Sequence, residues 1–435
     1  MTQMSPHLVS DKPNDTAARS RSVRDVLRRG IGFYKLAAVI LMNTIITLIV
    51  ANVLSDVVNR IWEKQSHQQE DRLCESLFTE KYHDYTVPQL RELLKETRRT
   101  REYEFAPYLG YKYRPVSQEY THITAAGFRW STDNGPWPPS ANNLNVFVYG
   151  ASTTFGRGVT DDQTIPAQLQ EFLKGKCDKP VKVYNFGTAC YNSTAERIQF
   201  ANMLAQGLRP DVAVFIDGNI DALHYSDDPP LTGEMRELME DRGYGLLKAG
   251  RPFFHELPMT KLANKLSETL AEKTGHSNKI CFNQAQLDQI IARYTANFPQ
   301  AQSDHIIARY TANKRLIEVQ AREFGVNTLF VWQPCSSYKF NQLWQWIIHP
   351  DFSPIQMVPT YERMAQRVKD GSPAFTRNFL WLADIQEGAT EPCYLDNSHY
   401  RANLCKTIGI AIGQSLLNRH LLAQEMTPRV ESPTR

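Results

Sequence analysis

A run of twenty uncharged residues near the start of the chain constrains its fold more than any other feature. The run from Leu36 to Ser55 reads LAAVILMNTIITLIVANVLS, and its only strongly polar side chains are Asn43 and Asn52. About 20 such residues in a helix cross the hydrocarbon core of a bilayer. A buried core helix seldom runs this long without a charge. The run is also longer than a typical signal-peptide core, and no cleavage site of small residues follows it. The sequence therefore predicts one transmembrane helix at residues 36–55.

The charges that flank this segment predict its orientation. Seven Lys and Arg residues precede it within residues 1–35, whereas the charges that follow Ser55 nearly cancel. The positive-inside rule then places residues 1–35 in the cytoplasm and the rest of the chain outside it, in the periplasm if the cell is Gram-negative. Disulfides become possible in that compartment, but seven cysteines leave at least one unpaired and their pairing stays open.

Composition and charge exclude several classes of protein. Lys and Arg number 49 against 46 Asp and Glu, a formal net charge of +3, whereas a dedicated nucleic-acid-binding protein shows a strong basic excess. Hydrophobic residues make up 42% of the chain, which excludes an intrinsically disordered protein. The cysteines lie far apart with no CxxC pair, so no zinc site is indicated. We expect no nucleic acid, metal or cofactor as a ligand, and the oligomeric state stays open.

Beyond residue 104, four short apolar runs predict strands that are buried on both faces. These runs are Asn145–Tyr149, Val181–Phe186, Val212–Ile216 and Thr328–Trp332. Near-continuous Val, Ile and Phe bounded by turns are typical of parallel sheets. Amphipathic helices at Ile165–Leu173 and Thr194–Ala205 separate the first three runs. The alternation predicts a three-layer α/β/α sandwich around a central parallel sheet, whose ligands bind beyond the carboxyl ends of the strands.

The remaining segments complete the predicted organisation. It comprises a tail at 1–35, a transmembrane helix at 36–55, a stalk or packing helices at 56–104, a folded domain at 105–425 and a flexible tail at 426–435. Insertions near 222–322 and 336–378 exceed what crossovers need and are candidates to cap a substrate cleft. The first includes a helix-like stretch, Met259–Lys273, and the second carries Trp344 and Trp346, which we interpret as half-buried packing residues.

The first insertion also contains an identical repeat. IIARYTAN occurs at Ile290–Asn297 and again at Ile306–Asn313. An offset of 16 residues turns a continuous helix by about 160°, so the two copies would face opposite sides. Pro299 breaks the helix after the first copy in any case. We interpret the repeat as a local duplication and assign it no function.

Two separate features carry residues suited to chemistry. The first predicted strand ends in the turn Gly150–Gly156, which lacks the Lys-Ser/Thr of a phosphate-binding loop and the GxGxxG of a dinucleotide site. It presents Ser152 at the carboxyl end of a strand. Far downstream, Asp396 and His399 stand three residues apart, close enough for the carboxylate to fix the imidazole tautomer and leave Nε2 to accept a serine proton. Each signal alone favours an ordinary turn or surface residue, and the pair favours a nucleophilic serine.

Loops after the second and third predicted strands hold possible hydrogen-bond donors. Gly187 follows the second strand, and Gly218, Asn219 and Asp221 follow the third. A glycine N–H and an Asn amide are the donors that an oxyanion needs. Gly and Asn are also common in loops with no such role.

Taken together, these residues resemble the SGNH (GDSL-type) hydrolase superfamily, whose four blocks centre on Ser, Gly, Asn and His. GASTTFG at 150–156 resembles the first block with Ala151 in place of the usual Asp, NFGTACYNS at 185–193 resembles the second, and DNSH with Tyr400 resembles the last. Gln333-Pro334 and the AGFR motif at 126–129 are similar to motifs of membrane-anchored bacterial members. The resemblance covers roughly residues 103–417 and implies a flavodoxin-like sandwich.

Carried over residue by residue, the resemblance implies a role for each candidate. Ser152 matches the nucleophile, His399 the general base and Asp396 the carboxylate that orients it. The backbone N–H groups of Ser152 and Gly187 match two oxyanion donors.

The third block departs from the family pattern Gly-x-Asn-Asp. Anchoring on Gly218 and Asp221 places Ile220 where the family has Asn, and Asn219 lies one position early. On an extended segment an adjacent residue points the other way, so Asn219 is the third donor only if the loop shifts. The loss of one oxyanion donor typically costs a factor of ~10²–10³ in rate.

Two functions follow from this reading. The first is a membrane-anchored extracytoplasmic serine esterase that acts on O-acyl or O-acetyl groups of envelope or exported polysaccharide, by hydrolysis or by transfer. Its partners are then the lipid bilayer, through residues 36–55, and an acylated glycan. The alternative, motivated by Ile220, is a catalytically weakened SGNH-fold component that binds a glycan or a protein within an envelope assembly.

Overall fold

The computed structural model describes most of the chain in eight stretches. These are residues 15–80, 85–99, 103–131, 133–223, 257–263, 299–340, 357–396 and 398–422, with side chains between 15 and 80 described for 28–61. Two compact units emerge. One comprises residues 1–69 with 244–274, and the other comprises residues 70–243 with 275–435.

The first unit is built on one long helix. Helix α1 (Asp15–Glu80) is continuous, and its stretch Arg28–Ile61 is long and apolar enough to cross a membrane by length and composition. In the most apolar 18-residue window of this stretch, no residue is buried within the described structure. The amide of Asn52 donates to the Leu48 carbonyl at 2.9 Å, so this polar side chain finds a partner on its own helix. A signal sequence near an N-terminus meets the same criteria of length and composition.

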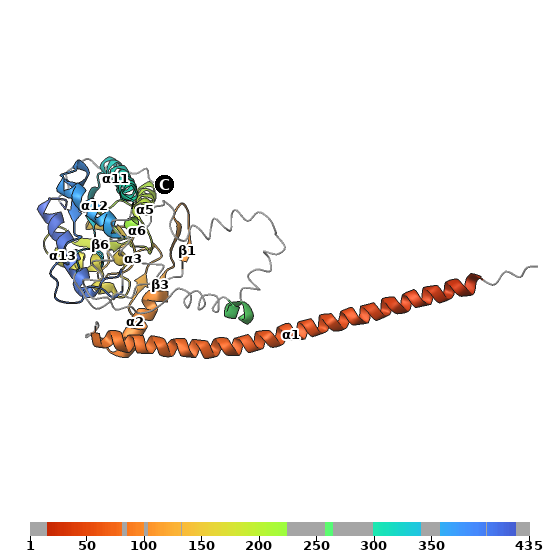
Figure 1. The fold of residues 1–435 in the computed structure, drawn as a ribbon. Helices are drawn as coiled ribbons and strands as arrows, with labels where there is room; N and C mark the ends of the chain where they lie inside the picture. Colours follow the sequence, from red (N-terminus) through yellow and green to blue (C-terminus); the bar gives the residue numbers. More distant parts are fainter. Residues whose placement is uncertain are drawn as a thin grey trace, which may run out of the picture. The chain divides into compact units, whose positions relative to one another are not determined.

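The second unit contains a five-stranded parallel sheet (Figure 1). Its strands are β5 (Leu144–Gly150), β6 (Val181–Asn185), β7 (Val212–Asp217), β8 (Asn327–Trp332) and β9 (Phe379–Trp381), in the spatial order β6-β5-β7-β8-β9. If the five strands are numbered in chain order from β5, they lie across the sheet in the order 2-1-3-4-5, which is the flavodoxin-like order. In that order the direction of winding reverses between β5 and β7. A crevice for ligands therefore forms at the carboxyl ends of these two strands.

Alternating side chains give the sheet one aromatic face and one aliphatic face. Successive residues of a strand point to opposite faces. Rings on β5, β7 and β8 gather on one face, namely Phe147, Tyr149, Phe215, Phe330 and Trp332. The other face carries Val146, Val148, Val214, Ile216, Leu329 and Val331. On the aromatic face the rings of Tyr149 and Phe215 are stacked at 4.9 Å, and those of Phe215 and Phe330 at 5.1 Å.

Helices cover both faces. On the aromatic side lie α5 (Ser193–Ala205), α11 (Gln300–Glu323) and α12 (Val358–Lys369). On the aliphatic side α4 (Ile165–Leu173) packs against α13 (Ala402–Asn418). The shorter helices are α3 (Ser152–Phe155), α6 (Asn219–Leu223) and the 3₁₀ turns Asp161–Gln163 and Pro373–Phe375. The result is a three-layer sandwich.

Smaller elements precede the sheet. Helix α2 (Val87–Arg99) buries Leu90 and Leu93. Strands β1 (Tyr103–Ala106) and β2 (Gly110–Tyr113) form an antiparallel hairpin, as do β3 (Val116–Ser117) and β4 (His122–Ile123). Arg129 then forms a bridge with Asn185 at the end of β6, so this segment borders the outer edge of the sheet.

The predicted fold class is confirmed. Each of the four predicted strands and both predicted helices coincide with observed elements to within one or two residues. The fifth strand, β9, was not predicted because three residues are too short to show a period. The second IIARYTAN copy lies within α11, where it buries Ile306, Ile307 and Tyr310. The first copy, Trp344, Trp346 and most of Met259–Lys273 lie outside the described residues.

Cysteines form no disulfide among those that the structure places. Cys177, Cys190, Cys335, Cys393 and Cys405 are all present as thiols. Burial raises the pKa of the Cys335 thiol to about 11 and that of Cys405 to about 12. These buried thiols therefore behave as small apolar groups in the core.

The contact between α4 and α13 depends on a glycine. A Cβ built on Gly409 would lie 2.9 Å from the Leu169 nitrogen and 3.0 Å from the Ile165 carbonyl oxygen, both of which are backbone atoms. We expect Gly409→Ala to lower the free energy of unfolding by about 1–3 kcal/mol, because the two helices must separate. Thermal or urea unfolding measures this effect. The matched change Gln414→Ala, at an exposed position of the same helix, should leave stability nearly unchanged. Equal stability of the two variants would contradict the close approach.

Candidate active site

A tight turn after β5 presents the predicted nucleophile. Strand β5 ends at Gly150, and Ser152 begins the single-turn helix α3. The turn closes at Gly156, whose φ of 86° lies in the left-handed region that favours glycine. A Cβ on Gly156 would also lie 2.5 Å from the Thr164 methyl group. Ser152 is thus held at the carboxyl end of a central strand.

A buried arginine holds this turn in place. Arg129 is 1% exposed, and its guanidinium donates to the Phe155 carbonyl at 2.9 Å and the Gly156 carbonyl at 2.7 Å. It also donates to the Val159 carbonyl at 2.8 Å and pairs with Asp161 at 2.7 Å. A buried charge is tolerated only when it is paired and its donors are satisfied. Arg129 therefore fixes the carbonyl groups at the end of the turn that carries Ser152.

A narrow loop places the predicted base and its carboxylate together. Tyr394 and Tyr400 form an antiparallel bridge that closes the loop. Within it, Oδ1 of Asp396 accepts the backbone N–H groups of Ser398 and His399, each at 2.8 Å. These two bonds orient the carboxylate toward the imidazole. Nδ1 of His399 lies 2.7 Å from Oδ2 of Asp396.

The structure brings Ser152, His399 and Asp396 into one hydrogen-bonded chain. Nε2 of His399 lies 2.9 Å from Oγ of Ser152, although the two residues are 247 positions apart. Enclosure alone would raise the pKa of Asp396, although 53% of its side-chain surface is exposed. The His399 imidazole and the two backbone N–H groups outweigh this effect and hold the pKa well below its usual range. The ionised Asp396 accepts a hydrogen bond from Nδ1–H of His399 and so keeps that proton on Nδ1. Nε2 of His399 is then the nitrogen that can accept a proton.

Gly187 lies against the same turn. A Cβ on this residue would lie 2.3 Å from the Phe155 nitrogen, so only glycine allows the loop after β6 to pack on α3. Its N–H donates to Oδ1 of Asn185 at 3.0 Å, and Nδ2 of Asn185 donates to the Thr154 carbonyl at 3.1 Å. In this structure the N–H of Gly187 is therefore engaged within its own loop.

Asn219 lies at the switch point after β7. The sequence-based argument treated this segment as extended, but Asn219–Leu223 is the short helix α6, so strict alternation does not apply and that premise was wrong. Gly218, at φ 121°, allows the turn between strand and helix. Oδ1 of Asn219 accepts the Tyr361 hydroxyl at 2.6 Å, and Nδ2 lies 3.4 Å from the Tyr400 hydroxyl. Two tyrosine hydroxyls therefore fix the plane of this amide, one at its oxygen and one at its nitrogen.

A buried glutamine connects the residues adjacent to Ser152 and His399. Oε1 of Gln333, just beyond β8, lies 2.7 Å from the Thr153 hydroxyl and 2.8 Å from the Tyr400 hydroxyl. Gln333 is 1% exposed. Since Thr153 follows Ser152 and Tyr400 follows His399, one carbonyl oxygen accepts a hydrogen bond from each side of the candidate site.

Several of these residues carried no predicted role. Arg129 and Gln333 stood in motifs noted only for resemblance, and Tyr361 and Thr153 were not singled out. For Gln333 and Thr153 the sequence did offer a signal, which was their position. Gln333 directly follows a predicted strand, and Thr153 directly follows the candidate nucleophile. Tyr361 gave no signal, since its helix reaches the site only through the fold.

Three carboxyl groups lie buried beneath the Asn219 loop. Glu196, Asp217 and Asp221 are each at most 4% exposed. Desolvation, followed by repulsion from neighbouring carboxylates, raises the pKa of Glu196 and Asp217. Asp221 has more hydrogen-bond and charge partners, because the Ser193 hydroxyl donates to it at 2.6 Å and Arg309 lies 3.9 Å away. Burial therefore favours the protonated form of Glu196 and Asp217.

Within the described stretches, no group of three or more His, Cys, Asp or Glu side chains is arranged to hold a metal ion.

Comparisons with known proteins returned structural neighbours alone. No family model and no curated protein matches the chain. Solved structures that resemble it include a lipase/acylhydrolase from Enterococcus faecalis, with 12% identity, 65% of this chain and 99% of that chain covered, and a TM-score of 0.32. Another is a catalytic variant of an acetylxylan esterase from Geobacillus stearothermophilus, with 14% identity, 67% and 99% covered, and a TM-score of 0.31. A third is a member of the lipolytic G-D-S-L family from Veillonella parvula DSM 2008, with 8% identity, 63% and 96% covered, and a TM-score of 0.30.

The buried carboxyl pair makes stability depend on pH. A carboxyl whose pKa is raised on folding contributes stability that is complete below the pKa of the unfolded chain and is lost as the pH rises through the folded value. Glu196→Gln keeps the size of the side chain and removes one ionisable group from the pair. We expect the variant to gain free energy of unfolding relative to wild type between about pH 4 and pH 7.5, as measured by thermal unfolding. The exposed control Glu171→Gln should show no such trend, and a gap that is equal at both pH values would contradict the raised pKa of Glu196.

Proposed function

We propose that the protein is a serine esterase of SGNH type, with Ser152 as nucleophile, His399 as general base and Asp396 as the orienting carboxylate. The observation that carries this proposal is the 2.9 Å contact between Oγ of Ser152 and Nε2 of His399, at the carboxyl edge of a flavodoxin-like sheet. A lone buried Ser–His contact could be structural. Here the imidazole is backed by a carboxylate of depressed pKa, which is the arrangement that activates a serine.

The proposed reaction proceeds in two balanced steps. Oγ of Ser152 attacks the ester carbonyl carbon while Nε2 of His399 takes the hydroxyl proton. The tetrahedral intermediate then collapses, the C–O bond to the alcohol breaks, and His399 returns the proton to the leaving alkoxide. The acyl group stays on Ser152 until water, or the hydroxyl of another sugar, attacks its carbonyl carbon while His399 takes the proton of the attacking hydroxyl. The bond between the acyl carbon and Oγ of Ser152 then breaks, and His399 returns the proton to Oγ. Hydrolysis returns the acid, and transfer yields a new ester.

Asn219 is the proposed donor for the oxyanion, together with the N–H of Ser152. Its position at the start of α6, beside Tyr400, brings its amide to the same sheet edge as Ser152. Gly187, the other proposed donor, must release Asn185 before its N–H can serve.

The cellular setting is part of the proposal. Helix α1 would anchor the protein through residues 36–55, and the basic residues before this span favour a cytoplasmic N-terminus with the enzyme outside. In that compartment, O-acyl groups on envelope or exported polysaccharide are the proposed substrates.

Labelling with a fluorophosphonate probe tests the nucleophile. We expect full-length wild-type protein to label and to hydrolyse 4-nitrophenyl acetate, and Ser152→Ala to lose labelling and at least ~10³-fold in kcat, because no other group can form the acyl-enzyme. Ser117→Ala, at an exposed serine outside the sheet, is the matched control and should retain both. Folded wild-type protein that neither labels nor turns over ester would leave the binding role as the surviving function.

Two substitutions separate a donor from the residue that positions it. Asn219→Ala should lower kcat by ~10²–10³ if its amide stabilises the oxyanion. Tyr361→Phe removes the hydroxyl bonded to Oδ1 of Asn219, and we expect a smaller loss, about tenfold, with KM nearly unchanged. The Tyr361 hydroxyl also donates to the Gln333 carbonyl at 2.9 Å, and the double variant separates the two contacts. It should be no slower than Asn219→Ala alone if Tyr361 acts through the Asn219 amide. Independent, additive losses would refute the coupling.

A further inference from the structure

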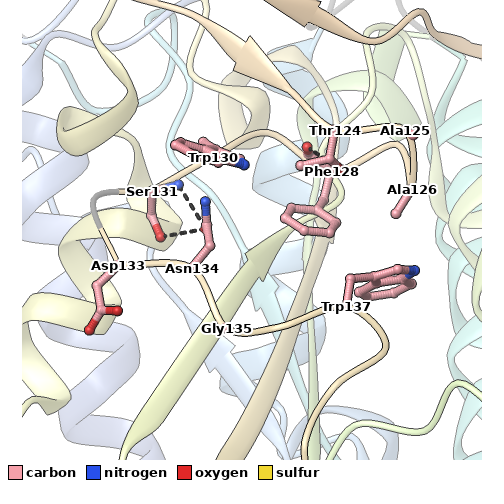
Figure 2. Close-up of a pocket in the computed structure, with 10 residues that line it drawn as sticks. All are labelled: Thr124, Ala125, Ala126, Phe128, Trp130, Ser131, Asp133, Asn134, Gly135 and Trp137. Carbon is pink, nitrogen blue, oxygen red and sulfur yellow. Dashed lines mark hydrogen bonds between the residues drawn. The ribbon is translucent and has the colours of Figure 1, made fainter.

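A hollow lies on the outer edge of β6. It encloses about 500 Å³ and is lined by residues of the segment 124–137 (Figure 2). Arg129 of this segment bridges Asn185 at the carboxyl end of β6, and Lys182, nearer the other end, pairs with Asp133. The hollow therefore runs along the strand edge, outside the Ser152–His399 pair, and neither residue lines it.

Aromatic rings form a rigid wall and floor of the hollow. Phe128 and Trp137 lie 5.3 Å apart, and Trp137 also packs against Phe147, Tyr184 and Phe186 at 5.7–5.9 Å. These contacts hold the Trp137 indole in one place before any ligand arrives. Figure 2 shows the Phe128 and Trp137 rings toward one side and polar side chains toward the other.

Trp130 supplies an exposed ring on the same hollow. It is 48% exposed, although it directly follows the fully buried Arg129. One face of its indole stacks on His122 at 5.5 Å with an interplanar angle of 27°. His122 is itself held, since Nδ1 lies 2.8 Å from Oδ2 of Asp161. The indole is thus fixed in orientation while about half of its surface faces solvent, which is the usual state of a recognition residue rather than of a core residue.

Polar groups at the hollow suit hydroxyl ligands. The Ser131 hydroxyl and N–H both lie 2.9 Å from Oδ1 of Asn134, and Nδ2 of Asn134 is enclosed without a hydrogen-bond partner among the residues that the structure describes. Asp133 is the only charged side chain among the described lining residues. Because Lys182 neutralises this carboxylate, the hollow carries no net charge and favours a neutral ligand that combines apolar faces with hydroxyl groups.

We propose that this hollow binds a neutral pyranose ring of the acylated glycan, with the ring stacked on Trp130, as a subsite distinct from the candidate active site. The inference rests on the proposed function for the choice of glycan. A sugar ring has an apolar face that an indole can cover and hydroxyl groups that Asn134 and Asp133 can bond.

A continuous set of contacts connects this subsite to the nucleophile turn. Asp161 pairs with His122 through Oδ2 and with Arg129 through Oδ1. His122 supports Trp130, and Arg129 holds the carbonyls of Phe155 and Gly156. A glycan bound at Trp130 would therefore be positioned by the same carboxylate that positions the Ser152 turn.

Binding is tested in full-length Ser152→Ala protein, which cannot consume an ester, kept in a polyoxyethylene detergent whose headgroup is not a sugar. The probes are O-acetylated xylo-oligosaccharides, the same oligosaccharides after deacetylation, O-acetylated gluco-oligosaccharides and, as the anionic counterpart, oligogalacturonate. Titration calorimetry should detect binding of at least one neutral probe and markedly weaker binding of oligogalacturonate. Binding of no neutral probe, or tighter binding of oligogalacturonate, overturns the proposal.

Substitutions then locate the binding. Trp130→Ala should raise Kd by about tenfold, and Trp130→Phe should raise it much less, because a smaller ring still stacks on the sugar. Tyr108→Ala, which removes an aromatic ring that is 86% exposed elsewhere on the domain, should leave Kd unchanged. Ala125→Gln fills part of the hollow from its exposed rim, leaves the core intact, and should also weaken binding. If Trp130→Ala and Ala125→Gln both bind like wild type, the site lies elsewhere and the proposal is wrong.

The result of the binding experiment can be distinguished from the result of the test of the proposed esterase activity. Turnover of 4-nitrophenyl acetate by wild-type protein reports on Ser152 alone. An inactive protein that still binds the oligosaccharides through Trp130 would refute the esterase and retain the subsite, whereas an active protein without this binding would do the reverse.

Discussion

One oxygen atom, Oε1 of Gln333, ties the two halves of the candidate site to each other. It accepts from Thr153, next to Ser152, and from Tyr400, next to His399. The serine and the histidine come from parts of the chain 247 residues apart, and this oxygen links the two loops that carry them. In a buried setting, displacement of the Ser152 turn would take the Thr153 hydroxyl away from its acceptor, which is costly. Tyr400 is held a second time, because its hydroxyl also donates to the Pro334 carbonyl at 2.6 Å.

The central sheet and the candidate triad were open to prediction because their signals are local. Strands buried on both faces read as continuous apolar runs, so β5, β6, β7 and β8 were found close to their observed limits. Asp396 and His399 stand within one turn of each other, and the carboxylate bonds the loop backbone as well as the ring. The general rule for parallel sheets then indicates that Ser152 and His399 converge at one edge.

What escaped prediction depends on distant contacts. The helical course of Asn219–Leu223 follows from packing beneath Tyr361 and above the buried carboxyl pair, and the motif alone suggested an extended segment. Strand β9 is defined by its pairing with β8 rather than by its own three residues. The role of Arg129 depends on hydrogen bonds from its guanidinium to the carbonyl groups of Phe155, Gly156 and Val159, and these contacts form only in the folded chain. The sequence pattern of a segment indicates its periodicity, but it does not indicate which other segment it will pack against.

The thiols buried against the sheet have a consequence for the chemistry of the core. Cys335 and Cys405 are enclosed and carry raised pKa values, and none of the cysteines that the structure describes is bridged. Oxidation of a thiol requires thiolate character and exposure to the oxidant. These two side chains have neither, so they resist oxidation for as long as the packing around them stays closed.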